Sequence, residues 1–220
     1  MARTAPNRQR VIDHGEVFTP PELVQKMLDL VAGECERIDS RFLEPACGDG
    51  NFLAEILRRK LRTVDAQNAK NRARWERYAF LAVCSIYGID LLADNVAECR
   101  LRMLEIVRGA YLDRFNEPLS AEAERALTFI LARNILQGDA LSLRTTDDAP
   151  ITFSEWSPLN GNLIKRRDFV YEHLLEHAHI ANMPLFSDLG KDVYVPLPVR
   201  EFPPTHYLQA PDAESVHARP

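Results

Sequence analysis

The chain has 220 residues, 46% of them hydrophobic and 27% charged, which is typical of a folded globular protein and excludes global disorder. Its four cysteines form no Cys-x-x-Cys pair and no secretory signal precedes them, so we expect reduced thiols in the cytoplasm and no structural zinc. No apolar run approaches the ~20 residues that cross a bilayer, so no membrane partner is expected. The net charge of −5 gives no global attraction to DNA, and DNA contacts would need local basic patches.

The chain divides by its proline content. Nine of the 14 prolines lie from Pro150 onward. We therefore expect a helix-rich domain over residues 15–150 and an extended, proline-rich C-terminal extension over residues 151–220. Residues 1–14 are expected to form a flexible N-terminus.

The first expected element is a helix that starts near residue 19. Thr19 would be the N-cap, Pro20 the first helical residue, and Glu22 the partner in a capping box. The helical spacing of apolar residues predicts a buried face made of Leu23, Val24, Met27, Leu28 and Val31.

A strand, a glycine turn and a second helix follow. Residues 42–44 are predicted as a short buried strand and residues 45–50 as a tight turn, in which two glycines permit positive φ and the close approach of a ligand. The next helix begins at Asn51. Its inner face is predicted to hold Phe52, Leu53, Ile56, Leu57 and Leu61.

The same alternation continues along the chain. We expect an inserted helix around residues 66–80, a strand that ends at residues 88–90, helices over residues 94–107 and 120–133, and a strand over residues 134–137. Strands that alternate with helices predict an α/β layer structure with a mainly parallel sheet. Ligands of such sheets bind beyond the carboxyl ends of the strands.

Three acidic residues fall at or just past the predicted strand ends: Glu44, Asp90 and Asp139. The Gly48-Asp49-Gly50 turn lacks the third glycine of a dinucleotide fingerprint, and the chain has no Gly-Lys-Ser/Thr phosphate loop. The carboxylates would repel a pyrophosphate but attract a cationic ligand, and Asp90 could accept both hydroxyls of a ribose. S-adenosylmethionine, which carries a sulfonium, an ammonium and a ribose, fits these residues.

Four segments resemble the cofactor motifs of adenine-N6 DNA methyltransferases of restriction-modification type, in the same order. They are residues 15–20 (GEVFTP), 42–52 (FLEPACGDGNF), 87–90 (YGID) and 134–141 (NILQGDAL). The resemblance covers about residues 15–141 and implies a Rossmann-like methyltransferase sheet that binds S-adenosylmethionine. It implies that Asp90 holds the ribose and Asp139 the adenine amino group. It assigns the methionine moiety to Phe18, Thr19, Pro20, Glu44, Pro45, Ala46, Cys47, Gly48, Gly50 and Phe52.

The sequence departs from this family where catalysis would occur. Such enzymes carry Asn/Asp/Ser-Pro-Pro-aromatic after a fourth strand, because an amide and a carbonyl accept hydrogen bonds from the adenine amino group and the aromatic ring stacks on the flipped base. The nearest match, residues 157–160 (SPLN), lacks the second proline and the aromatic residue, and leaves Ser157 and Pro158 as catalytic candidates. Only 60 residues follow, so the sheet is expected to be incomplete.

Three functions remain open. In the first, the chain is the cofactor-binding subunit of a split DNA methyltransferase, and a partner polypeptide supplies the acceptor-base motif and target recognition. Alternatively, it is a non-catalytic methyltransferase-fold module that binds DNA or protein in a restriction or anti-phage system. The third is a complete small methyltransferase that uses Ser157 and Pro158 as a minimal acceptor motif, or that acts on a different substrate.

Other patterns have simpler explanations beside the functional ones. The glycine turn could serve no ligand, and Asp90 and Asp139 could merely cap helices. Residues 173–177 (HLLEH) match a zinc-protease pattern, but no third ligand follows, and we expect a solvated helix surface without metal.

Basic residues gather over residues 58–77 and 165–167, either as solvated helix surface or as phosphate contacts. Trp75 and Trp156 are expected in a core or an interface. The aromatic tail should be ordered, packed beside the third strand or in a subunit interface, with residues 193–199 extended.

Overall fold

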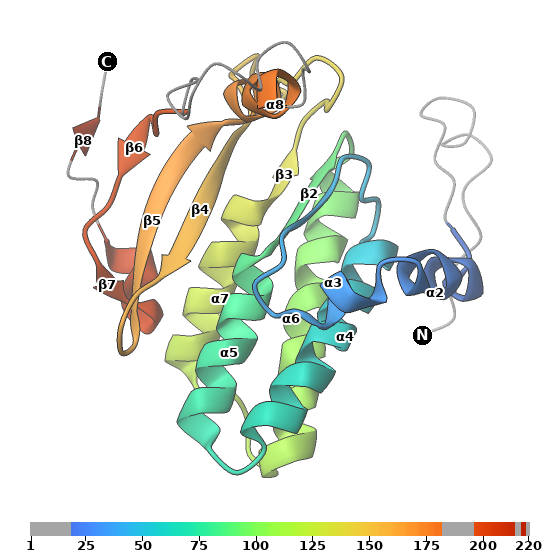
Figure 1. Ribbon diagram of the computed structural model, residues 1–220, viewed down its shortest axis with the longest axis vertical. Helices are drawn as coiled ribbons and strands as arrows, with labels where there is room; N and C mark the ends of the chain where they lie inside the picture. The colour runs from blue at the N-terminus through green and yellow to red at the C-terminus, as the bar shows by residue number, and fades with distance from the viewer. Residues whose placement is uncertain (1–18, 182–195, 214–216, 219–220) are drawn as a thin grey trace.

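A computed structural model describes residues 19–181, 196–213 and 217–218 of the chain (Figure 1). It shows a mixed α/β fold with a parallel three-stranded sheet, a set of long helices and a second, antiparallel sheet. Among these residues, no helix is both long enough and apolar enough to span a membrane.

The first sheet is parallel, as predicted. Its strands are β1 (Phe42–Glu44), β2 (Ile86–Asp90) and β3 (Ile135–Gln137), and they lie in the order β1-β2-β3. Both pairings are parallel, with Glu44 opposite Gly88 and Asp90 opposite Gln137. The carboxyl ends of all three strands therefore meet at one edge of the sheet, where ligands of α/β proteins bind.

Four long helices share one core with one face of this sheet: α4 (Asn51–Asn68), α5 (Arg72–Cys84), α6 (Ala93–Phe115) and α7 (Ala121–Asn134). Their buried residues share one core with Ile86 and Ile135. Because side chains alternate along a strand, Tyr87 and Ile89 of β2 face the opposite side. There they pack against Ile151 and other residues of the C-terminal part of the chain.

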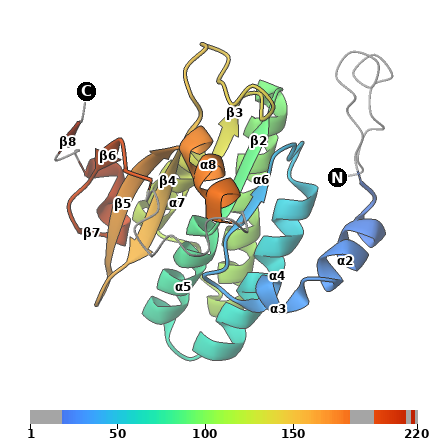
Figure 2. The ribbon, with the colours of Figure 1, turned by 45° about the horizontal axis from the view of Figure 1, so that its top comes forward.

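The C-terminal part forms the second sheet (Figures 1 and 2). Its elements are β4 (Thr152–Pro158), β5 (Leu163–Val170), α8 (Tyr171–Ala181), β6 (Arg200–Glu201), β7 (Thr205–His206), the 3-10 helix η2 (Tyr207–Asp212) and β8 (His217–Ala218). We expected an extended tail here, and that prediction was wrong because a β-hairpin organises the segment. Its signal is Asn160-Gly161, since Gly161 has φ +70° in the loop between β4 and β5.

The second sheet does not stand apart from the first. Trp156, Ile164 and Tyr207 belong to the same core as the four long helices, and Phe153 packs on Tyr87 of β2. The tail therefore covers the second face of the parallel sheet. Both tryptophans are core residues, as predicted, with Trp75 1% and Trp156 5% exposed. Residues 193–195 of the segment that we expected to be extended lie outside the described residues.

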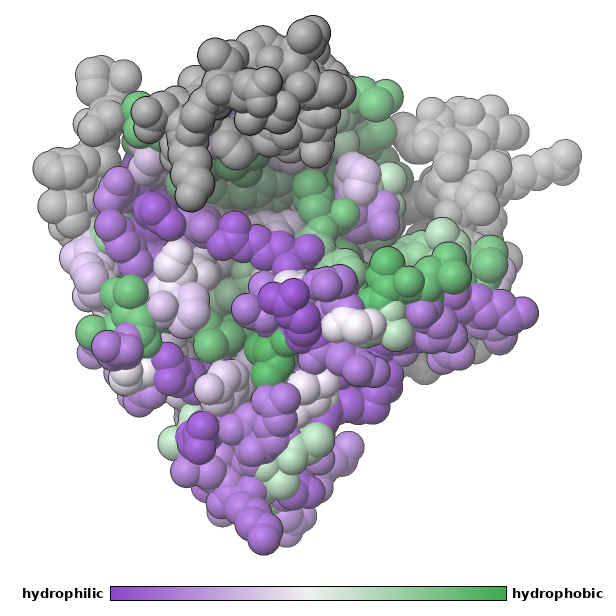
Figure 3. Space-filling model, viewed as in Figure 1, coloured by the Kyte–Doolittle hydropathy of each residue, from purple (hydrophilic) through white to green (hydrophobic). Residues whose placement is uncertain are grey.

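The predicted start of the first helix was wrong. Helix α2 (Pro21–Asp29) has Pro20 as its N-cap and no side-chain cap, so Thr19 forms no capping box. Only Val24 and Leu28 of the predicted apolar face are buried. The exposed members of that face, together with Leu30, form a hydrophobic patch over α2 that Figure 3 shows on the outer surface. A short helix, α3 (Ala32–Glu36), follows.

The remaining elements were predicted with shifted boundaries. Helix α4 begins at Asn51, as expected, whereas α7 begins at Ala121, one residue later than predicted, with Ser120 as its N-cap. Helix α5 runs on to Cys84, later than predicted, and α6 continues to Phe115 because its buried face extends to Tyr111.

Candidate functional site

A cavity of about 500 Å3 opens at the carboxyl ends of the three parallel strands, within the size range of small-molecule sites. Glu44 and Asp90, the last residues of β1 and β2, and Asp139, two residues past the end of β3, all line it. The other sequence-predicted residues in its wall are Thr19, Pro45, Ala46, Cys47, Gly48 and Phe52. The fold thus brings together residues from four distant segments of the chain, around residues 19, 44–52, 90–95 and 138–141.

Of the predicted cofactor residues that the structure describes, Pro20 and Gly50 are not among those that line this cavity. Phe18 lies outside the described residues. Pro20 is exposed at the start of α2. Gly50 has φ +88°, and a Cβ built on it would lie 2.6 Å from Sγ of Cys99 on α6. Gly50 therefore adopts a backbone conformation that favours glycine, and its lack of a side chain allows the turn to pack closely against Cys99 of α6.

Backbone hydrogen bonds fix the glycine turn to the neighbouring strand. The N–H of Gly48 donates to Oδ2 of Asp90 at 2.8 Å, and the N–H of Cys47 donates to the carbonyl of Ile89 at 2.9 Å. Gly48 itself adopts a left-handed conformation with φ 52°. The turn and the end of β2 consequently form one rigid wall of the cavity.

The Asp90 carboxylate also supports the entry to α6. Its Oδ1 accepts hydrogen bonds from the N–H of Leu92 at 2.9 Å and from Nδ2 of Asn95 at 3.2 Å. With Gly48, these bonds occupy three of the roughly four acceptor positions of a carboxylate. Asp90 is therefore not a helix cap, because the N-cap of α6 is Leu92 and no described side chain caps this helix; the Asp90 carboxylate supports the segment before α6 and still lines the cavity.

Asp139 caps a turn and not a helix. Its Oδ1 accepts a hydrogen bond of 2.8 Å from the N–H of Leu141. This bond and a second one from Ser142 hold the pKa of the Asp139 carboxyl below its usual value. Asp139 is thus ionised beside the cavity, and no helix follows it before β4.

The wall of the cavity is acidic. Its lining residues include four carboxylates, Glu44, Asp49, Asp90 and Asp139, and no lysine, arginine or histidine. Burial raises the pKa of Glu44, so its ionised form is less favourable than that of an exposed glutamate. A cationic ligand would stabilise the ionised form of Glu44, whereas the four carboxylates of the wall would repel a polyphosphate.

Cys47 lies in the glycine turn but is a poor nucleophile. A hydrogen bond with the Cys99 thiol and burial both raise the pKa of Cys47 well above that of a free cysteine. Because the thiolate is the reactive form, this cysteine stays an inert part of the cavity wall.

Sequence reasoning missed two polar residues of the wall, Asn51 and Asn95. Nδ2 of Asn51 donates to the carbonyl of Thr19 at 3.2 Å, and Asn95 supports Asp90. Both had a signal in the sequence. Asn51 lies inside the segment that resembles the family, and Asn95 faces Asp90 from the first turn of the following helix.

The structure does not bring Ser157 and Pro158 to this cavity. They line another cavity, together with Ser85, the residue before β2, and so lie toward the amino ends of the parallel strands. Oγ of Ser157 accepts a hydrogen bond from Arg167 at 3.4 Å.

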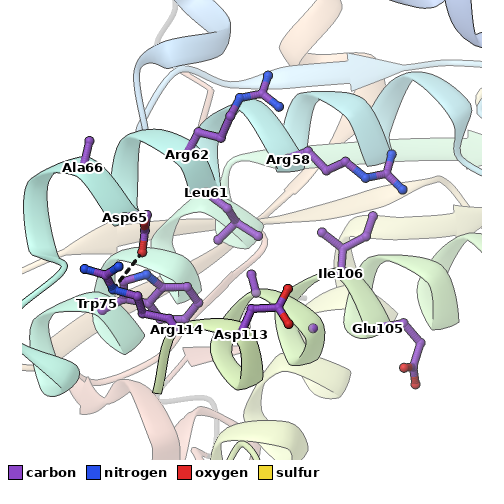
Figure 4. A pocket seen from close by; sticks show the side chains of 12 residues that line it. Arg58, Leu61, Arg62, Asp65, Ala66, Trp75, Glu105, Ile106, Asp113 and Arg114 are labelled. Atoms are coloured by element: carbon purple, nitrogen blue, oxygen red, sulfur yellow. Dashed lines mark ion pairs between the residues drawn. The ribbon is translucent and has the colours of Figure 1, made fainter. Parts of the chain in front are cut away.

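A larger cavity of about 650 Å3 lies between α4 and α6 (Figure 4). Its wall mixes basic and acidic side chains, and Arg114 pairs with Asp65 across it at 3.3 Å. No strand end or glycine turn contributes to this cavity, so nothing in its wall selects one class of ligand.

The basic clusters are largely engaged within the protein. Arg58, Arg59 and Arg62 all pair with Glu55, and Lys60 is fully buried. In the second cluster, Arg166 is buried against Asp168 at 2.8 Å. Lys60 and Arg166 are thus not solvated surface residues as we expected, because each satisfies buried acceptors.

The zinc-protease pattern finds no support among the described side chains, where no cluster of three His, Cys, Asp or Glu residues could hold a metal ion. His177 lies outside the described side chains.

Comparison with known proteins adds no relative: no family model, no curated protein and no solved structure matches the chain.

Proposed function

We propose that this chain binds S-adenosylmethionine in the cavity at the strand ends, as the cofactor-binding part of an adenine-N6 DNA methyltransferase with a Rossmann-like sheet. The observation that carries the proposal is the convergence of Glu44, Asp90, Asp139 and the glycine turn on one cavity. These residues come from three of the four segments whose sequence resembles the family.

The charges of the wall fit this cofactor. The acidic wall favours a ligand that carries a sulfonium and an ammonium, and Asp90 keeps acceptor capacity for a ribose hydroxyl. When bound, S-adenosylmethionine would supply the methyl group for transfer to adenine N6. The glycine turn and the carboxylates of Glu44, Asp90 and Asp139 would bind and orient this methyl donor.

We further propose that a partner polypeptide supplies the acceptor-base motif. Within the described residues, β1 pairs with β2 alone, so its other edge is open. A cavity of about 300 Å3 lies beside that edge, with Leu43, Tyr87, Phe153 and Phe169 in its wall. Open strand edges that adjoin apolar pockets accept a strand from another chain. Such a strand would end next to the cofactor cavity, where the flipped adenine has to lie.

One observation favours the non-catalytic alternative. Both oxygens of Asp90 and one oxygen of Asp139 already accept hydrogen bonds from the chain itself. A methyltransferase-fold module that binds DNA or protein without cofactor would need no more than these structural roles. The two proposals differ in whether S-adenosylmethionine binds.

A methyl-transfer assay tests the split enzyme. The purified chain, mixed with adenine-containing DNA and methyl-labelled S-adenosylmethionine, should label the DNA only when the product of the adjacent reading frame is added. Robust labelling by the chain alone would disprove the need for a partner and return Ser157 and Pro158 to consideration. No labelling with the partner present, despite cofactor binding, would disprove the adenine methyltransferase assignment.

A further inference from the structure

Arg102 of α6 contacts the cavity wall from behind. Its Nη1 donates a hydrogen bond of 3.0 Å to Oδ1 of Asn51, and Nδ2 of Asn51 donates one of 3.2 Å to the carbonyl of Thr19. Thr19 and Asn51 line the cavity, whereas Arg102 does not. The three residues form a chain of hydrogen bonds that runs from a buried helix to the rim of the site.

This arrangement fixes the orientation of the Asn51 amide. A guanidinium only donates and a backbone carbonyl only accepts. The amide therefore satisfies both neighbours in a single orientation, with its oxygen toward Arg102 and its nitrogen toward Thr19. In the flipped orientation, the Asn51 amide loses its hydrogen bonds to both Arg102 and Thr19. If Arg102 were absent, flipping the amide would break only the bond to Thr19 and would cost less free energy.

Arg102 also holds the glycine turn. Its Nη1 donates to the carbonyl of Asp49 at 3.4 Å and lies 3.6 Å from the Asp49 carboxylate. The side chains of both residues are about three-quarters buried, at 27% and 20% exposed, so this ion pair is only partly screened by water. One guanidinium thus joins α6, the turn and, through Asn51, the segment that precedes α2.

We propose that Arg102 is a positioning residue of the cofactor site, which acts through Asn51 to hold Thr19 against the cavity. The identity of the cofactor rests on the proposed function. The role of Arg102 in holding Asn51 and Thr19 does not depend on which ligand binds.

A double-mutant cycle tests the pathway through Asn51. Arg102→Met and Asn51→Ala should each weaken S-adenosylmethionine binding about tenfold, since each removes a charge-assisted or amide hydrogen bond. The double variant should bind no more weakly than the worse single variant. Losses that multiply would show that Arg102 acts independently of Asn51. Arg108→Met is the matched control, because Arg108 lies on the same helix and pairs with Glu105 and Glu124 away from the cavity.

Asn51→Asp separates positioning from general stabilisation. A carboxylate still accepts the hydrogen bond from Arg102 but cannot donate to the carbonyl of Thr19. We expect this variant to unfold at the same urea concentration as the wild type and still lose cofactor affinity. Wild-type affinity in Asn51→Asp would overturn the role of the Thr19 bond.

Amide hydrogen exchange of residues 19–29 keeps this inference distinct from the proposed function. Without any ligand, Arg102→Met and Asn51→Ala should speed exchange there, while Arg108→Met should not. If exchange responds but the wild type binds no S-adenosylmethionine, the proposed function is wrong and the positioning role stands. If the wild type binds and neither exchange nor affinity changes in Arg102→Met, the positioning role is wrong.

Discussion

The backbone N–H of Gly48 donates a hydrogen bond of 2.8 Å to the carboxylate of Asp90, which joins the turn after the first parallel strand to the end of the second. The same carboxylate lines the cavity and accepts two further hydrogen bonds at the start of α6. Asp90 therefore supports the glycine turn and the start of α6, and its side chain also lines the cavity. Variants at position 90 should change both the stability of the fold and the affinity for the cofactor.

Replacing Asp90 by alanine should abolish detectable cofactor binding and lower the free energy of unfolding by about 1–3 kcal/mol, because Gly48, Leu92 and Asn95 lose their acceptor. Urea unfolding and calorimetry with S-adenosylmethionine measure the two effects. Asp94→Ala is the control, since Asp94 lies in the first turn of the same helix and outside the cavity wall. Unchanged affinity in Asp90→Ala would place the cofactor elsewhere.

Gly50→Ala should destabilise the fold by about 2–4 kcal/mol, through the left-handed conformation and a clash with Cys99. Gly161 is a matched control because it also has positive φ, +70°, but has open space around its Cβ position. Gly161→Ala should cost only the backbone term, about 1 kcal/mol. Adding Cys99→Ala should restore part of the stability of Gly50→Ala. Equal losses at the two glycines in urea unfolding would argue against the packing role.

Cofactor affinity should depend on pH through Glu44. Burial raises the pKa of Glu44, so this carboxylate takes up a proton at a pH where exposed glutamates remain ionised. Binding of the cationic cofactor should therefore weaken, as the pH falls, before other glutamates titrate. Glu44→Gln should remove this step, and it should raise the stability of the free protein at neutral pH, since folding disfavours the ionised form. The same pH profile in wild type and Glu44→Gln would exclude Glu44 as the cause.

Replacing Lys60 should lower the stability of the fold and should not change DNA binding. Its ammonium donates to the carbonyls of Arg37, Ile38 and Ser40 at 2.7, 3.1 and 2.6 Å. Lys60→Met should cost about 2–4 kcal/mol, because three carbonyls lose their donor. Arg58→Met on the exposed side of the same helix should cost far less.

The pKa of Lys60 gives this prediction a second readout. Burial lowers it to about 8 in the folded protein, below the value of an unfolded lysine. The unfolded chain then binds more protons between pH ~8 and ~10, so the wild type should gain stability relative to Lys60→Met as the pH rises through this window. A constant difference between the two proteins across the window would contradict the lowered pKa.

Local patterns in the sequence predict much of the parallel sheet. The run Phe42-Leu43-Glu44, the two glycines after it and the alternation of helices place β1, the turn and the acidic strand ends correctly, although β1 is not the buried strand that we predicted, since Leu43 is exposed. What the sequence misses depends on long-range packing. Leu23 and Met27 have helical spacing, yet they are exposed because α2 lies at the outer side of α4 (Figure 1).

The antiparallel sheet escaped prediction for a related reason. Its attachment depends on Asn134, whose Oδ1 accepts a hydrogen bond from the Trp156 indole and whose Nδ2 donates to three carbonyls around the start of β2. Asn134 and Trp156 are 22 positions apart, and the residues around each of them do not indicate that the two side chains are in contact. Likewise, the partnership of Arg102 with Asn51 spans 51 positions and follows only from the packing of α6 on the turn.

Calorimetric titration of the purified chain with S-adenosylmethionine, compared with ATP, tests the central claim most directly. ATP shares the adenosine but carries a polyanion in place of the cationic methionine, so the four carboxylates of the cavity should accept the first ligand and reject the second. We predict one binding site for S-adenosylmethionine per chain, lost in Asp90→Ala, and no measurable binding of ATP. Failure of S-adenosylmethionine to bind, or equal binding of ATP, would contradict the assignment of this cavity.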